Sequence, residues 1–390
     1  MTSIDTWIIS EASEHYRHLH QYPELSFQEK QTHQYICGVL KKHGITYENI
    51  GNTSVIGFIP GQYPTHTVAL RADTDALPLQ EASCHPYPSQ HPGIMHACGH
   101  DVHTACLLGA AIYLKQHQAS LPVNIMLIFQ AAEEVLPGGA LEILQSSFFN
   151  SHYPEWIIAQ HAEPDLPVGN VGLCPGPYMA SGDEIYITLE GPGGHAALPD
   201  KSVDLVLIAS HIVVALQQIT SRHASPFMPT VLTFGNVRCQ SAMNIIPKEI
   251  ILEGTFRTFD ENWRRQAKMD IENISSAIAH SMGAKGKTEI ITGYPSLYNN
   301  PEKAAHTLRI LESEFGKEHV ILLSKRMTTE DFARYSQCIP ATFIRLGVQG
   351  KLPGGKLHTP EFYADPEALS YGIRTLCSLA MSSSVFITHY

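Results

Sequence analysis

Several short apolar segments of this chain are followed by side chains that can bind a metal ion. Asp75 comes shortly after the run VAL, Glu134 shortly after IMLIF, His161 two positions after WIIA, and His358 some way after TFIRLG. Wholly apolar runs of this length fit strands that are buried on both faces of a parallel sheet. Because ligands gather at the carboxyl ends of such strands, we expect these side chains to meet at one edge of the sheet.

A segment rich in histidine, His96–His103, directly precedes a predicted helix, and its Cys-Gly-His spacing marks Cys98 and His100 as metal ligands. A thiolate and imidazoles favour a transition metal, whereas calcium and magnesium sites are built from oxygens. The predicted ligands combine a thiolate, imidazoles and a carboxylate; they are Cys98, His100, Glu134, His161 and His358.

Five ligands are one more than a closed tetrahedral site needs, so we predict two divalent ions, with zinc, manganese, cobalt and nickel all left open. Two ions together polarise a carbonyl and lower the pKa of a bridging water. Glu133, beside the ligand Glu134, is the expected general base, which takes a proton from water and passes it to a leaving amine. Asp75 is expected to orient a ligand imidazole.

The remaining histidines are interpreted more conservatively. The chain has 22 His, and an isolated one is usually a hydrogen-bonding or solvated residue. We interpret His20 as a structural hydrogen bonder. His103 could share a helix face with His100, and we assign it a structural or orienting role.

The elements that must position these residues alternate between strands and helices. Residues 4–42 are predicted to be helical with a break at Pro23, and strands are predicted at 53–59, 67–71, 123–129, 156–159 and 342–346. A helix is predicted from Asp101 to Gln116. This alternation predicts an α/β catalytic domain built on a mostly parallel sheet.

A different pattern follows from Asp183. Strand and helix patterns occur there in the order βαββαβ, which is the ferredoxin-like order, and Gly and Pro cluster at both ends of the segment. We therefore predict an inserted α+β domain at 183–296, between a first catalytic part at 1–182 and a second at 297–390.

Length and composition set further limits. The chain has 390 residues, a net charge of −11 and no basic cluster, so it is long enough for two domains and nucleic acid is not an expected partner. No apolar run is long enough to predict a membrane span, and the N-terminus has no signal-peptide pattern, so we expect a cytoplasmic protein. The 8 cysteines are then expected to be reduced.

The motifs carry a family resemblance that runs through nearly the whole chain in order. They are LHQYPELSFQE, RADTDALP, HACGHDVHT, AAEE, GPGGHAALP, NIIP, TEDFA and LHTPEF. This series resembles the amidohydrolase branch of the aminoacylase/carboxypeptidase di-metal peptidases. That branch includes hippurate hydrolases, auxin-conjugate hydrolases, and N-acetylcysteine and N-acetyl-diaminopimelate deacetylases. The resemblance implies the same five ligands and the same catalytic base that the residues themselves suggested.

The resemblance also implies features that the residues alone do not. The inserted domain would act as a lid and dimerise, giving a homodimer or a higher homo-oligomer. His195 would reach the neighbouring subunit's metals and stabilise the oxyanion, while Asn244 and Arg257 would hold the oxyanion or the substrate carboxylate.

Two departures from the family pattern affect the expectations. Where the wider superfamily has a ligand His in the stretch H-x-D-x-x-P, this chain has Asp73, so His100 is expected to supply the imidazole. The bridging ligand stays open, with Cys98 preferred. Asp200 stands where the branch has His, which we expect to alter the pocket rim and substrate preference.

These observations predict a metal-dependent amidohydrolase that cleaves N-acyl amino acids to a carboxylic acid and an amino acid. The acyl group could be acetyl, benzoyl or similar. Two alternatives stay open: a dipeptidase or carboxypeptidase on the same scaffold, and a non-catalytic homologue that binds an acyl-amino acid.

Overall fold

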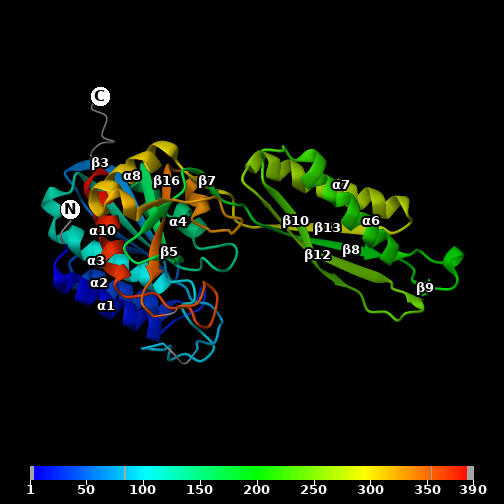
Figure 1. Ribbon diagram of the computed structural model, residues 1–390, viewed down its shortest axis with the longest axis horizontal. Helices are drawn as coiled ribbons and strands as arrows, with labels where there is room; N and C mark the ends of the chain where they lie inside the picture. The colour runs from blue at the N-terminus through cyan, green and yellow to red at the C-terminus, as the bar shows by residue number, and fades with distance from the viewer. Residues whose placement is uncertain (1–3, 83–84, 353, 384–390) are drawn as a thin grey trace. The chain divides into compact units, whose positions relative to one another are not determined.

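The computed structural model describes residues 4–82, 85–352 and 354–383. The chain forms two compact units. Unit 1 comprises Met1–Gly176, Tyr298–Ser324 and Asp331–Tyr390, and unit 2 comprises Pro177–Leu297 and Lys325–Glu330. Each unit has its own buried apolar core. Figure 1 shows the chain coloured from the N- to the C-terminus.

Unit 1 is built around an eight-stranded sheet with the order β1-β2-β4-β3-β5-β16-β6-β15. Its strands are β1 (Thr46–Ile50), β2 (Ser54–Ile59), β3 (Tyr63–Asp73), β4 (Val123–Gln130), β5 (Trp156–Pro167), β6 (Val171–Leu173), β15 (Val320–Leu322) and β16 (Ala341–Gln349). The central strands β4, β3, β5 and β16 are all parallel, whereas β1 and β2 pair antiparallel at one edge. The expected α/β fold with a large, mostly parallel central sheet is confirmed.

Helices pack on this sheet because their buried faces are apolar. They are α1 (Thr6–Gln21), α2 (Lys30–Lys42), α3 (His100–Gln116), α4 (Ala140–Gln145), α5 (Ser147–Ser151), α8 (Pro301–Phe315), α9 (Ala333–Ser336) and α10 (Ala368–Met381). α3 is buried along nearly its whole length, and α1, α2 and α10 pack against it (Figure 1). A helix buried on all sides is apolar all round, which explains why α3 lacks a polar face.

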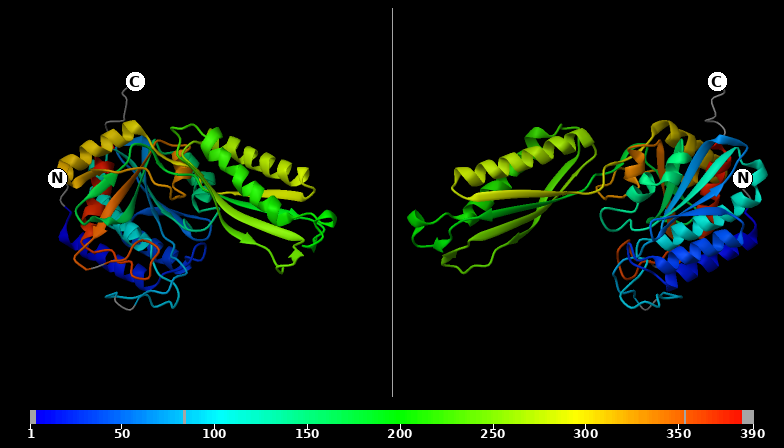
Figure 2. Two further views of the ribbon diagram at one scale, coloured as in Figure 1. Left: turned by 45° about the vertical axis from the view of Figure 1, so that its right-hand side comes forward. Right: turned by 180° about the vertical axis from the view of Figure 1, so that it is seen from behind.

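Unit 2 contains the βαββαβ order expected from the sequence. Its elements are β8 (Asp183–Glu190), β9 (Gly194–His195), α6 (Leu205–Gln218), β10 (Thr230–Arg238), β11 (Ile245–Ile246), β12 (Glu249–Thr258), α7 (Glu261–Ser281) and β13 (Lys285–Thr292). The four longer strands form an antiparallel sheet in the order β10-β12-β8-β13. Figure 2 shows α6 and α7 side by side on one face of that sheet. Two short strands, β7 (Gly176–Met179) and β14 (Leu297–Asn299), pair with each other in a separate small sheet.

One helix of the described residues, Leu205–His223, is long and apolar enough to span a bilayer by length and composition. Within it, α6 buries Leu205, Ile208, Ile212 and Leu216 in the core of unit 2. A helix that lines a protein core passes the same test, so this finding is weak evidence for a membrane span.

The N-terminus of α3, next to the predicted ligand His100, is tied to α1 by a buried histidine. His20 Nδ1 lies 2.6 Å from Asp101 Oδ2, and its Nε2 lies 2.9 Å from Glu81 Oε1. Burial by itself lowers the pKa of His20, but the hydrogen bonds to Asp101 and Glu81 raise it to about 9. His20 is therefore an imidazolium between two carboxylates, in keeping with its predicted structural role.

Replacing His20 by Gln should destabilise the protein in a pH-dependent way. Because the folded-state pKa is raised, the stabilisation is complete below the unfolded pKa of about 6.5 and is lost as the pH rises towards 9. The wild type should exceed His20→Gln by roughly 3 kcal/mol at pH 6, and by much less at pH 9.5. Scanning calorimetry at both pH values measures the difference. His66→Gln, which removes an exposed imidazole from Glu155, is the control, and an equal loss at both pH values would contradict the assignment.

Candidate metal centre

The predicted chemistry-bearing side chains meet at one edge of the sheet of unit 1 because three neighbouring strands are parallel and in register. Asp73 at the end of β3 pairs with Gln130 at the end of β4, and Arg71 in β3 pairs with Ala159 in β5. Parallel strands end on the same side, so the segments after β3 and β4 and the second half of β5 converge.

All five predicted ligands lie within this cluster. Cys98 Sγ is 3.4 Å from His161 Nε2 and 3.3 Å from His358 Nε2. Glu134 Oε1 is 3.3 Å from His358 Nε2 and 3.8 Å from His100 Nε2. These atoms form overlapping groups that could hold a metal ion, and Cys98 belongs to two of them, one with His100 and His161 and the other with Glu134 and His358. The arrangement fits two neighbouring ions that share a ligand.

Hydrogen bonds set the tautomers of two of the histidines. His161 Nδ1 lies 2.8 Å from the carbonyl oxygen of Ala162, to which it donates, so Nε2 is the nitrogen with a lone pair. His100 Nδ1 lies 3.1 Å from Asp75 Oδ1, which leaves Nε2 as the nitrogen that could bind a metal ion. Asp75 therefore contacts a predicted ligand in the way expected of an orienting carboxylate.

One atom in the cluster provides an independent test of whether a metal fits. His100 Nε2 is buried and has no hydrogen-bond partner among the described residues. A buried polar atom without a partner is costly, and native structures satisfy such atoms with protein groups, water or ions. An imidazole nitrogen and a carboxylate oxygen beside a cysteine thiol form a donor set that suits a divalent transition metal.

His103 is not among the predicted ligands, and its contacts explain why it is unsuited to be one. Its Nδ1 lies 2.5 Å from Asp73 Oδ1, and its Nε2 accepts a hydrogen bond from the Ala162 backbone N–H at 2.7 Å. Both ring nitrogens are engaged, so His103 supports the backbone next to His161. Asp73 is held in turn by Arg71 Nη1 at 2.6 Å.

The charge states of the ligands follow from burial and from their neighbours. Burial lowers the pKa of His161 well below its ordinary value, with Arg345 adding to the effect, so this imidazole is neutral and ready to ligate. Hydrogen bonds to Cys98 and Glu134 raise the pKa of His358 to about 10. Metal binding at His358 therefore displaces a proton, and metal affinity should rise with pH.

Three backbone positions in the cluster adopt the left-handed conformation. Gly99 has φ 81°, Ala132 has φ 54° and His358 has φ 61°. A Cβ at Gly99 would also lie 2.7 Å from the Cβ of Ala162, so only glycine fits between Cys98 and His100. Left-handed non-glycine residues are strained, and they cluster at functional sites, where the surrounding structure holds them in place.

The residues predicted in the inserted domain lie in unit 2. His195 in β9 is exposed and pairs with Ile245 in β11, and the backbone N–H of Ala196 donates to the Asn244 carbonyl at 3.0 Å. The structure therefore brings His195 and Asn244 together. Arg257 lies in β12 near the start of β8, whereas β9 follows the end of β8. Since β8 rises ~24 Å over its length, Arg257 is not grouped with the other two.

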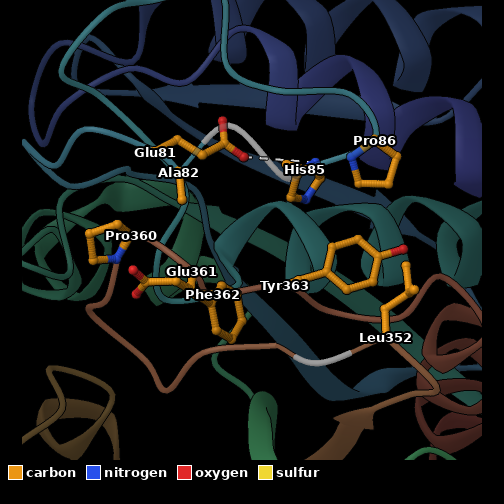
Figure 3. A pocket seen from close by; sticks show the side chains of 9 residues that line it. All are labelled: Glu81, Ala82, His85, Pro86, Leu352, Pro360, Glu361, Phe362 and Tyr363. Carbon is orange, nitrogen blue, oxygen red and sulfur yellow. Dashed lines mark ion pairs between the residues drawn. The ribbon is translucent and has the colours of Figure 1, made fainter.

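A separate small pocket of about 180 Å³ lies beside the turn that carries His358 (Figure 3). Its lining includes Glu81, His85, Pro360 and Tyr363. Ala82 donates its backbone N–H to Pro360 O at 2.9 Å, and the rings of His85 and Tyr363 pack edge to face at 4.9 Å. These contacts hold the residues that follow His358, Pro360 and Tyr363, against Ala82 and His85.

His20, Glu81 and His85 form a further group of possible ligands at this pocket. The two imidazoles are stacked, with ring centroids 3.8 Å apart and planes at 10°. Imidazole lone pairs lie in the ring plane. Two rings stacked face to face direct their lone pairs along two separate, nearly parallel planes, so the lone pairs do not converge on one ion. We therefore assign this group a structural role.

Comparisons with known proteins agree with the geometry. The model of peptidase family M20/M25/M40 matches residues 69–382. An N-acetyl-L-cysteine deacetylase of Bacillus subtilis is 40% identical over 354 residues, which cover 90% of this chain and 83% of that protein. An N-acyl-L-amino acid amidohydrolase of Geobacillus stearothermophilus is 37% identical, with 82% of this chain and 89% of that protein covered. The crystal structure of the B. subtilis YXEP protein, a dinuclear metal binding peptidase, is 31% identical with a TM-score of 0.83, covering 97% and 98% of the two chains.

Replacing Asp75 by Asn should weaken metal binding without unfolding the protein. The substitution disturbs the partner of His100 Nδ1 and an acceptor for the Glu134 backbone N–H, which is 3.0 Å from Asp75 Oδ2. We expect metal affinity to fall about 10–100-fold, as is usual when an orienting carboxylate is lost. Titration of the chelator-treated protein with Zn²⁺ or Mn²⁺ measures it. As a control, Ser26→Ala removes only the hydroxyl that donates to Asp75 Oδ2, and its effect on metal affinity should be smaller. Equal metal affinities in Asp75→Asn and wild type would refute the orienting role of Asp75.

Proposed function

Because the chain belongs to peptidase family M20/M25/M40, we propose that it is a metal-dependent amidohydrolase that cleaves N-acyl amino acids to a carboxylic acid and an amino acid. The observation that carries the proposal is the convergence of Cys98, His100, Glu134, His161 and His358, two of which, His100 and Glu134, also group with the buried carboxylate of Glu133. Relatives named as a deacetylase and an amidohydrolase of N-acyl amino acids, at 40% and 37% identity, support it.

We propose that the five ligands hold two divalent ions, with Cys98 as the shared ligand. Zinc, manganese, cobalt and nickel all suit this mixture of donors. When bound, the ions would polarise the acyl carbonyl and lower the pKa of a water molecule. His161 and His100 would ligate through the Nε2 atoms that their hydrogen bonds expose.

Glu133 is the proposed general base. It is 6% exposed, and it lies in a group with His100 and Glu134 whose ligand atoms are within 4.8 Å of one another. A carboxylate in this position takes a proton from the attacking water and passes it to the nitrogen of the leaving amino acid. This transfer lets the amide C–N bond break with a neutral amine as the leaving group.

We propose that His195 and Asn244 stabilise the oxyanion and that Arg257 binds a substrate carboxylate. The exposure of His195 and the backbone hydrogen bond between its neighbour Ala196 and Asn244 support the first role. The separation of Arg257 from these two residues indicates that it serves a different part of the substrate or a different subunit. Arg257 is packed so closely that a Cβ at Gly182 would lie 2.2 Å from its Nη1.

We further propose that residues 183–296 form a lid and dimerisation domain between catalytic parts at 1–182 and 297–390. The compact unit 2 supports this division. An exposed apolar face of α6 supports self-association: Leu207 is 48% and Val214 is 73% exposed, and the two lie seven residues apart on one side of the helix. A contiguous exposed apolar patch is typical of an interaction surface. A homodimer or higher homo-oligomer in the cytoplasm is the arrangement that we propose.

The reaction is tested by measuring amine release from acetyl-, benzoyl- and indoleacetyl-amino acids and from dipeptides, with Zn²⁺, Mn²⁺, Co²⁺ or Ni²⁺ added. Hydrolysis of N-acyl amino acids is expected. Hydrolysis of dipeptides alone would establish a peptidase instead, and no turnover with two ions bound would favour a binding protein. Asp200 is expected to influence which acyl group is preferred.

Replacing Glu133 by Gln should abolish turnover while leaving metal binding intact. The amide keeps the shape of the side chain but cannot accept the proton, so we expect kcat to fall by about 10²–10⁴-fold. Elemental analysis of the variant should find as much metal as in wild type. Undiminished turnover by Glu133→Gln would remove the proposed base.

Mixing inactive variants tests the contribution of a second subunit. His195→Ala and Glu133→Gln chains should each be nearly inactive, but heterodimers should contain one site with both wild-type residues if His195 acts across the interface. Co-expression with two affinity tags isolates the heterodimer. Activity no higher than that of the two homodimers would place His195 in the same subunit as the site that it serves, or outside the reaction.

A further inference from the structure

The backbone N–H of Asp331 donates a hydrogen bond to the carboxylate of Glu133, with 3.3 Å between N and Oε1. Both residues are buried, at 0% and 6% exposure. A general base works only when its carboxylate is held at a productive angle to the water that it deprotonates. A donor that is itself fixed can hold one carboxylate oxygen and so limit rotation of the carboxylate.

The side chain of Asp331 is anchored by three donors. Its Oδ1 accepts from Arg71 Nη2 at 2.6 Å, and its Oδ2 accepts from Gln130 Nε2 at 2.6 Å and from the Ala140 N–H at 3.2 Å. Hydrogen bonds between buried charged groups are strong and directional. The position of the Asp331 backbone, and of the N–H that contacts Glu133, is therefore set by this anchor.

The anchor starts from β4, the strand that precedes the base in the chain. Gln130 is the last residue of β4, three positions before Glu133 in the chain. Its Oε1 accepts hydrogen bonds from Arg71 Nε at 3.1 Å and from Tyr335 Oη at 3.0 Å, which orient its Nε2 towards Asp331. The contacts close a ring, in which Gln130 holds Asp331 and Asp331 holds Glu133.

Asp331 needs such an anchor because of where it lies. It sits in a turn outside the helices and strands, at the point where the chain returns to unit 1 after residues 325–330. No helical or sheet hydrogen-bond pattern fixes its N–H. Its conformation there is set by its side-chain contacts together with its carbonyl, which accepts a hydrogen bond from the Arg334 N–H at 2.9 Å.

We infer that Asp331 is a positioning residue for the general base: its carboxylate, anchored by Arg71 and Gln130, fixes the N–H that orients Glu133. The inference rests on the amidohydrolase function proposed above. The Asp331 side chain has no chemical role of its own in this proposal. It acts only through the N–H that contacts Glu133, and this dependence makes the inference testable.

Asp331→Asn is the test substitution. An amide nitrogen in place of Oδ2 would face the Gln130 Nε2 donor, and Gln130 cannot flip without losing its bonds to Arg71 and Tyr335. We expect kcat to fall about 10–100-fold with KM changed less than about twofold, as for a misplaced base. Metal content should equal that of wild type. In crystal structures of the metal-free proteins, the Asp331 N to Glu133 Oε1 contact should be kept in wild type and broken in the variant.

A double-mutant cycle separates positioning from general structural damage. If Asp331 acts through Glu133, adding Asp331→Asn to Glu133→Gln should change the residual rate less than about twofold, because the base is already absent. Glu314→Gln, which breaks another arginine–carboxylate pair of unit 1, with Arg374, is the matched control and should keep the wild-type kcat. Tyr335→Phe removes one donor to Gln130 and should give a smaller loss of kcat that also vanishes in the Glu133→Gln background. This milder variant serves if Asp331→Asn does not fold.

The outcomes are distinct. An unchanged kcat in Asp331→Asn, an equal further loss in the Glu133→Gln background, or loss of metal would each overturn the positioning role while leaving the proposed reaction in place. A wild-type protein that hydrolyses no amide of the panel would overturn both.

Discussion

The parallel pairing of β3 with β4 on one side and β5 on the other is the constraint on which the site depends. The register places Asp73 opposite Gln130 and Arg71 opposite Ala159. A slip of one residue would turn every side chain to the opposite face and separate these strand ends. The apolar runs that bury β4 on both faces hold the register, since all eight of its residues are buried. The core thus determines where the polar residues after it can lie.

This edge of the sheet concentrates negative charge in the protein interior. Asp73, Asp75, Glu133 and Asp331 are each less than 9% exposed, and Arg71 contacts two of them, Asp73 and Asp331. Burial opposes ionisation, but the pKa of Asp73 and that of Asp75 are held below the ordinary value by neighbouring histidines and, for Asp73, by Arg71. Buried charges persist only where partners compensate them. Bound divalent ions would supply positive charge to this carboxylate cluster.

The sequence was sufficient to predict the central strands and the residues that follow them, because a wholly apolar run followed by acidic residues or histidine is typical of a buried strand that ends at a site. It predicted the fold class for the same reason. It did not single out Asp331, which follows no apolar strand and meets Arg71 across 260 positions of the chain. The roles of Asp73 and Gln130 were missed because they depend on side-chain partners on other elements. The separation of Arg257 from His195 was missed because it follows from the direction of β8, which periodicity alone does not give.

The proposed ligands differ in how rigidly they are held, and this difference bears on the side from which a substrate would enter the metal centre. The side chain of His100 is 0% exposed and that of Glu134 is 11% exposed, whereas that of His358 is 54% exposed. His100 is also fixed by its hydrogen bond to Asp75. His358 has a left-handed backbone conformation, in a turn whose following residues line the small pocket. In the proposed centre, the buried ligands would define the position of the metals, and the His358 side is more exposed to solvent. A substrate carbonyl would then reach the proposed centre most directly from the side of His358, with Glu133 held from within the protein by the proposed Asp331 anchor.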